Sequence, residues 1–168
     1  MSDDFAPSTD ELLARNAEFA DAFDDADLPG APARALAVVA CMDCRIDVHR
    51  ILGLENGDAH IIRNGGGVVS DDVIRSLCLS QRSLGTREII LVHHTDCGLQ
   101  KTDAMAFTAE LEAELGVKPT WSVESFRDPY EDTRQSMARI RLSPFVAHDE
   151  HLRGFVYDVA DGRLHEVV

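Results

Sequence analysis

The sequence is poor in basic residues and has no long hydrophobic run. Lys and Arg number 16 against 30 Asp and Glu, giving a formal net charge of -14, which repels nucleic-acid phosphates and anionic membranes. No apolar run reaches the ~18 residues of a membrane helix. The first 30 residues hold nine acids and one base, whereas a signal peptide starts with basic residues. We expect a cytoplasmic protein with no nucleic-acid or membrane partner.

The 168 residues, 45% hydrophobic, suffice for one compact domain with a real core. Residues 1–7 are expected to be a loose terminus. Ser8 and Glu11 form a capping-box pattern that opens a helix, and the stretch from Asp24 to Pro32 breaks it and forms a linker. We therefore divide the chain into an acidic helical arm and linker over residues 1–33, suited to packing on a partner subunit, and a core domain over residues 34–168.

Short apolar runs in the core domain alternate with helical patterns, which indicates an α/β fold. Continuous apolar runs are typical of strands covered on both faces in a mainly parallel sheet. A hairpin around Asp161 and Gly162 is expected at the end of the chain. The expected strands cover 35–40, 59–62, 88–92, 154–159 and 164–167, and the expected helices cover 73–84, 102–115 and a segment starting at Pro129.

Two clusters of reactive side chains follow the first and third strands. Cys41 ends the first strand, and His94 and Cys97 follow the third. Residues beyond the carboxyl ends of neighbouring parallel strands converge on one crevice. Two thiolates and one imidazole are the ligands of catalytic zinc sites that keep a fourth position for water. We predict one zinc ion, held by Cys41, His94 and Cys97.

Cys44 leaves two alternatives open. With Cys41 it forms a Cys-x-x-Cys pair typical of redox dithiols, and with Cys41, His94 and Cys97 it would complete a closed structural zinc site. A redox pair gains nothing from His94 and Cys97, however. In an extended chain Cys44 points to a different side from Cys41, whereas Asp43 points to the same side.

Asp43 and Arg45 are spaced to form an ion pair. A carboxylate near zinc either ligates the metal or accepts a hydrogen bond from the bound water, and a paired Arg45 favours the second role. The alternative is an ordinary solvated surface pair. Gly65 and Gly66 let the backbone approach a small ligand closely, although glycine clusters are more often plain turns. Cys78 is expected to be a buried small hydrophobic residue.

Together these motifs resemble the β-class carbonic anhydrases, whose pattern is Cys-x-Asp-x-Arg, then Arg-Asn-Ala-Gly, then His-x-x-Cys-Gly. The chain has them in the same order at 41–45, 63–66 and 94–98, and the resemblance to short bacterial members runs from about residue 34 to the C-terminus. It implies zinc on Cys41, His94 and Cys97, a catalytic dyad of Asp43 and Arg45, and a homodimer or tetramer embraced by the N-terminal helix.

The chain departs from this family at two positions. Cys44 replaces a small Ala or Ser and Gly65 replaces Ala, so we count Cys44, Gly65 and Gly66 as candidate substrate-pocket residues. The expected reaction is hydration of CO2 to bicarbonate by a zinc-bound hydroxide that Asp43 orients. The alternatives are hydrolysis of carbonyl sulfide or carbon disulfide, which some family members carry out, and a zinc-stabilised binding protein without turnover.

Overall fold

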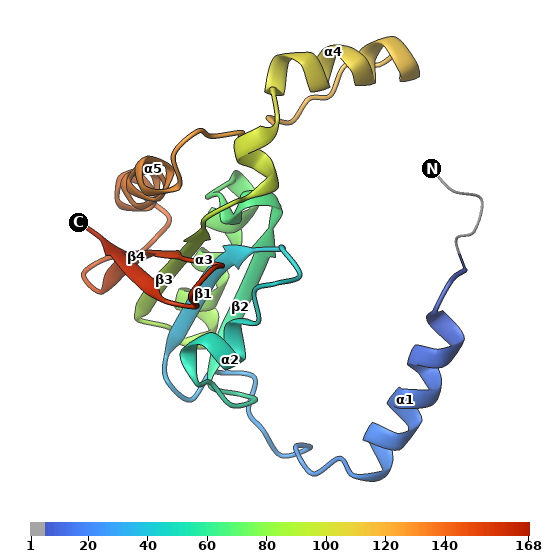
Figure 1. Cartoon of the computed structure of the whole chain (residues 1–168). Helices are drawn as coiled ribbons and strands as arrows, with labels where there is room; N and C mark the ends of the chain where they lie inside the picture. The colour runs from blue at the N-terminus through green and yellow to red at the C-terminus, as the bar shows by residue number, and fades with distance from the viewer. Residues whose placement is uncertain (1–5) are drawn as a thin grey trace.

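The computed structural model describes residues 6–168, so most of the loose terminus expected over residues 1–7 lies outside the described part. A five-stranded sheet has the order β2-β1-β3-β4-β5; it is parallel except for β5, which pairs antiparallel with β4, and helices flank it (Figure 1). The elements are α1 (Thr9–Asp21), β1 (Leu36–Cys41), α2 (Val48–Leu52), β2 (Ala59–Asn64), the 3-10 helix η1 (Gly65–Gly67), α3 (Asp71–Leu84), β3 (Glu88–His94), the 3-10 helix η2 (Gly98–Lys101), α4 (Ala104–Leu115), α5 (Pro129–Leu142), β4 (Leu152–Tyr157) and β5 (Leu164–Val167).

The central strand β1 pairs with β2 and β3 in a register that places the ends of all three strands at the same level. All six of its residues are buried, as expected for a strand covered on both faces. Leu36 is in register with Ala59 of β2 and with Glu88 of β3, so all three strands start at one level. Because they are parallel, their carboxyl ends lie at one edge of the sheet, and the loops that follow Cys41 and His94 are neighbours.

Two hydrophobic layers cover the faces of the sheet. One joins Ala37 and Val39 of β1 to the buried faces of α3 and α5, and the other joins Val38 and Ala40 to residues around α2. The alternation follows from the strand period of two. Ser70 caps α3 by accepting a hydrogen bond from Val73 N, and Asp128 caps α5 by accepting one from Tyr130 N.

Helix α1 stands apart from the sheet at the end of a long linker (Figure 1). Every one of its residues is exposed, including the apolar Leu12 and Phe19. The helix begins where expected, but the side chain of Ser8 makes no capping hydrogen bond, so the capping-box interpretation was wrong in that detail. Within residues 6–168 we find no helix with the length and apolar character needed to cross a membrane.

Three further features differ from, or add to, the sequence expectations. Helix α4 forms as expected but projects from the body (Figure 1), and all its residues are at least partly exposed. The short helix α2 was not expected; Asp47 caps it by accepting a hydrogen bond from Arg50 N, and Gly53 ends it in the left-handed conformation. Cys78 is partly exposed, so the prediction that it is buried was wrong.

Candidate metal centre

Cys41, His94 and Cys97 come together at the carboxyl edge of the sheet. All three are buried, and their ligand atoms lie within 4.8 Å of one another. His94 Nδ1 lies 2.9 Å from the backbone oxygen of Thr95, a contact that places the proton on Nδ1. Nε2 is then a free acceptor, and it has no hydrogen-bond partner within the described chain. This donor set fits zinc.

The two thiols are coupled by a hydrogen bond. This bond from Cys97 is the main cause that lowers the pKa of Cys41, against the opposing effect of burial and with help from His94. The same bond raises the pKa of Cys97. Burial opposes charge on His94, but its contacts with Cys41 raise its pKa overall. The lowered pKa of Cys41 favours a thiolate at this position, which suits a cation.

Asp43 lies beside this group and is held by Arg45. Arg45 Nε donates to Asp43 Oδ1 at 2.9 Å, Nη2 donates to Oδ2 at 2.7 Å, and the backbone N of Arg45 donates to Oδ1 at 2.9 Å. These hydrogen bonds hold the pKa of Asp43 well below its usual range. Asp43 Oδ2 lies 3.8 Å from His94 Nε2, so an ionised carboxylate borders the three ligand atoms. The structure thus pairs Asp43 with Arg45.

Arg63 and Asn64, which the sequence analysis placed in the second motif without giving them a role, fix the surrounding loops. Arg63 Nε donates to the backbone oxygen of Cys41 at 2.9 Å, and its Nη2 donates to that of Asp43 at 2.8 Å. Asn64 Nδ2 donates to the backbone oxygen of Val68 at 2.9 Å, across the glycine turn. The signal was their place next to Gly65, at the carboxyl end of β2.

The glycine turn forms one wall of a cavity of about 350 Å³ beside the ligand atoms. Gly66 adopts a φ of 83°, and a Cβ built on it would lie 2.9 Å from Leu99 Cδ1, so it requires glycine. A Cβ on Gly65 would meet Leu99 Cδ1 at 3.5 Å and Met42 Cε at 3.9 Å, which is ordinary contact. The residues that line the cavity are Cys41, Met42, Asp43, Gly65, Gly66, Cys97, Gly98, Leu99 and Thr102.

Cys44 does not join the site. Its side chain is exposed, it is absent from the residues that line the cavity, and it belongs to neither group of potential metal ligands in the described residues. The second such group, Asp158, Asp161 and His165, lies at the partly exposed β4–β5 hairpin. The geometry therefore offers three ligand atoms at the buried centre, without a fourth from Cys44.

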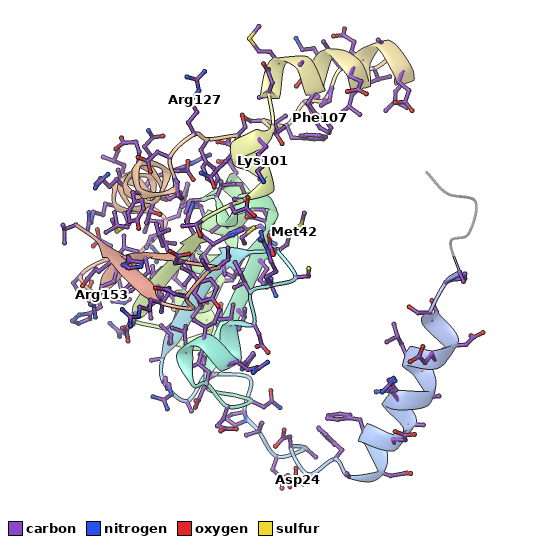
Figure 2. All side chains as sticks on the ribbon, in the orientation of Figure 1. Asp24, Met42, Lys101, Phe107, Arg127 and Arg153 are labelled. Carbon is purple, nitrogen blue, oxygen red and sulfur yellow. The ribbon has the colours of Figure 1, made fainter. Side chains whose placement is uncertain are left out.

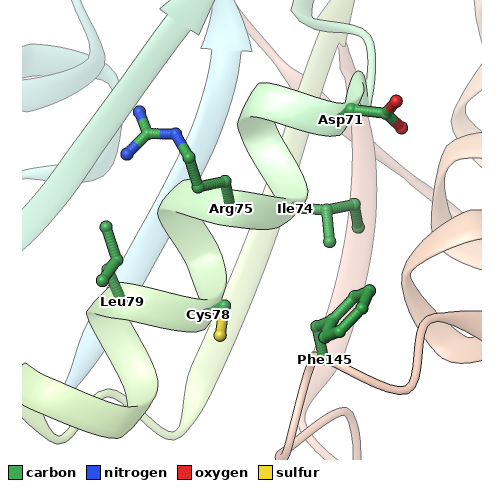
Figure 3. A pocket seen from close by; sticks show the side chains of 6 residues that line it. All are labelled: Asp71, Ile74, Arg75, Cys78, Leu79 and Phe145. Carbon is green, nitrogen blue, oxygen red and sulfur yellow. The ribbon is translucent and has the colours of Figure 1, made fainter.

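An apolar hollow of about 350 Å³ lies elsewhere, on the outer side of α3 (Figure 3). The side chains of Ile74, Cys78 and Leu79 border it from the helix, and Phe145 closes it from the segment after α5. It contains none of the candidate ligands. Figure 2 instead shows Met42 and Lys101 near the carboxyl edge of the sheet, where the metal centre lies.

The fold and the site together define an α/β protein in which two cysteines and a histidine, a donor set that fits a metal, meet at the carboxyl ends of parallel strands. The family model described as "Carbonic anhydrase" matches residues 36–144. The chain is 55% identical to "Beta-carbonic anhydrase 1" of Mycobacterium tuberculosis over 159 residues, covering 95% of this chain and 97% of the relative. It is 36% identical to a "Carbon disulfide hydrolase" of Acidianus sp., covering 78% and 76%.

Solved structures agree with the sequence matches. The carbonic anhydrase of Streptococcus mutans superposes with a TM-score of 0.90 at 41% identity, covering 98% of this chain and 99% of that one. A carbon disulfide hydrolase structure superposes with a TM-score of 0.73 at 31% identity, covering 95% and 89%. The chain belongs to the carbonic anhydrase family and is an enzyme of the β class.

Proposed function

We propose that the chain catalyses the reversible hydration of CO2 to bicarbonate, with one zinc ion held by Cys41, His94 and Cys97. The observation that carries this proposal is the juxtaposition of three buried ligand atoms within 4.8 Å with a carboxylate oxygen 3.8 Å from His94 Nε2. When bound, zinc lowers the pKa of a water molecule toward 7 and so supplies hydroxide near neutral pH.

Residues of the chain itself position the nucleophile and the substrate. Asp43, whose pKa the hydrogen bonds from Arg45 hold low, would accept a hydrogen bond from the nucleophile that a bound metal supplies, and would so orient an oxygen lone pair toward the substrate. Met42, Gly65 and Leu99 give the cavity an apolar wall suited to a small linear molecule such as CO2.

The assembly and location of the enzyme belong to the same proposal. Leu12 and Phe19 of helix α1 and Phe23 just after it are exposed on an arm that lies away from its own sheet (Figure 1). Such a surface is suited to a second copy of the chain, and burying it would contribute favourable hydrophobic free energy. We assign residues 1–33 to this arm, residues 34–168 to the catalytic domain, a homodimer or tetramer to the assembly, and the cytoplasm to the location.

The test of the proposed function is stopped-flow CO2 hydration by protein of known zinc content. We expect fast hydration that scales with bound zinc. Cys41→Ser should lower both the zinc content and the rate, while Gly30→Ala, a control in the linker where a Cβ has open space, should change neither. Zinc-loaded protein that hydrates CO2 no faster than buffer would refute the proposal.

Hydrolysis of carbonyl sulfide or carbon disulfide is the second candidate. Gly65 favours it, because the missing Cβ leaves room beside Leu99 and Met42 for a sulfur atom larger than oxygen. The test follows sulfide release from carbonyl sulfide and from carbon disulfide together with CO2 hydration. Gly65→Ala should reduce sulfide release by about tenfold relative to hydration, since one methyl group in an apolar pocket shifts specificity by about that factor. An unchanged ratio argues against this candidate.

A further inference from the structure

The guanidinium of Arg45 is held from two sides. On one side it pairs with Asp43 through Nε and Nη2. On the other side Nη1 donates to Asp96 Oδ2 at 3.0 Å, and Nη2 donates to the backbone oxygen of Asp96 at 3.0 Å. Asp43 lies on the loop after Cys41 and Asp96 lies directly before Cys97, so Arg45 joins the two loops that carry the candidate ligands.

Asp96 has a backbone conformation that serves this contact. Its φ is 56°, in the left-handed region that Asp, Asn and Gly tolerate and that other residues disfavour. In this conformation its carbonyl and its carboxylate both accept from the same guanidinium. The remaining carboxylate oxygen of Asp96 accepts a hydrogen bond from Lys101. Asp96 is therefore itself held in place while it holds Arg45.

The second side of the contact matters because Arg45 is exposed at the surface. A long exposed side chain that pairs with one carboxylate keeps much rotational freedom, and such a pair is weak. Four hydrogen bonds from its side chain to two loops restrict the plane of the guanidinium. The carboxylate of Asp43, which pairs with the same plane, is restricted with it.

We propose that Asp96 is a positioning residue for the proposed hydration reaction, acting through Arg45 to keep the Asp43 carboxylate beside the Cys41–His94–Cys97 group. The inference rests on the proposed function only for its kinetic consequence. The contact itself is a property of the chain and is measurable without turnover.

The test compares Asp96→Asn with Asp96→Gly. Asn keeps one acceptor oxygen and tolerates the φ of 56°, while Gly removes the side chain without backbone strain. Asp27→Asn, in the linker after α1, is the control for loss of one negative charge. For each protein the measurements are zinc per chain, kcat, KM and the NMR signal of Arg45 Nε–H, which is assigned from its loss in Arg45→Lys.

We expect kcat to fall about 3- to 10-fold in Asp96→Asn and further in Asp96→Gly, because displacement of a reacting group is costly even where an exposed ion pair is weak. KM and zinc content should stay at their wild-type values, because the cavity wall and the ligands are untouched. The Arg45 Nε–H signal should show faster exchange and freer rotation in both variants, and Asp27→Asn should behave as wild type.

An Arg45 signal identical to wild type in Asp96→Gly would overturn the inference, as would an unchanged kcat. A fall in kcat that follows zinc content in proportion would also overturn it, because the effect would then be loss of metal. If the wild-type protein does not hydrate CO2, the proposed function fails, but the Arg45 signal still decides whether Asp96 restrains the guanidinium.

Discussion

Replacing Gly67 by Ala places a methyl group against the backbone of the central strands. Gly67 has a φ of 71°, and a Cβ built on it would lie 2.8 Å from the backbone N of Cys41, 3.0 Å from Ala40 C and 3.3 Å from Val92 O. These are backbone atoms of paired strands, so no side-chain rotation relieves the contact. The first of them belongs to a candidate zinc ligand.

Backbone strain and overpacking both lower the free energy of unfolding of Gly67→Ala. The left-handed backbone costs Ala about 1 to 2 kcal/mol, and overpacking in a rigid core costs about 1 to 3 kcal/mol, so we expect a loss of about 2 to 5 kcal/mol in the free energy of unfolding. Gly65→Ala, two residues earlier in the same turn, is the matched control. Its Cβ makes contacts of 3.5 and 3.9 Å, and we expect no loss, or a gain of up to about 1 kcal/mol from reduced entropy of the unfolded chain.

The assay is urea unfolding at fixed protein and zinc concentrations, because metal binding and association both shift apparent stability. The midpoint should fall for Gly67→Ala and should stay level or rise for Gly65→Ala, with similar m-values. Equal midpoints for the two variants would refute the argument that the close approach of Gly67 to β1 demands glycine.

Further predictions concern the metal centre, the assembly and the half-buried Asp132. Asp43→Ala should keep its zinc and lose about 100-fold or more in kcat; full activity would mean that the carboxylate does not orient the nucleophile. Cys44→Ser should retain zinc measured by elemental analysis, whereas Cys41→Ser should lose it, and equal loss would restore the closed four-ligand interpretation. Deleting residues 1–30 should lower the number of chains per particle measured by sedimentation, and an unchanged number of chains would show that the arm is not required for association. Burial raises the pKa of Asp132 from 3.8 to about 6, so the folded chain binds this proton more tightly and stability falls as pH rises from about 4 to about 6. Asp132→Asn should remove up to about 3 kcal/mol of that dependence in melts at pH 4 and pH 7, and parallel pH dependences would contradict it.

The strands and the candidate ligand set were predictable from the sequence because they depend on local patterns. The apolar run that ends at Cys41 is a strand buried along its whole length, and strands ending at Cys41 and His94 converge by a general property of parallel sheets. Asp43 and Arg45 are two residues apart, so their pairing is also local. In each case the informative residues are neighbours in the chain.

The features that sequence reasoning missed depend on contacts between distant segments. Arg63 binds backbone oxygens some 20 residues away, and Asp96 meets Arg45 across 51 positions, so a motif can mark Arg63 as notable but no local pattern names the partner in either contact. The exposure of Cys78 depends on which side of α3 another element covers. Residue composition does not determine this, because the same helical periodicity fits either outcome.

Arg63 holds the loop after Cys41 through backbone atoms, so the conformation of that loop does not depend on its side chains. Because it binds the carbonyls of Cys41 and Asp43, the contact does not depend on which residues occupy positions 42 and 44, both of which are exposed. Substitutions at Met42 and Cys44 therefore leave in place the contacts that hold the loop after the candidate ligand Cys41. Of the two, Met42 also lines the cavity, so it is the first position at which to engineer selectivity, whereas Cys44 lies outside the cavity.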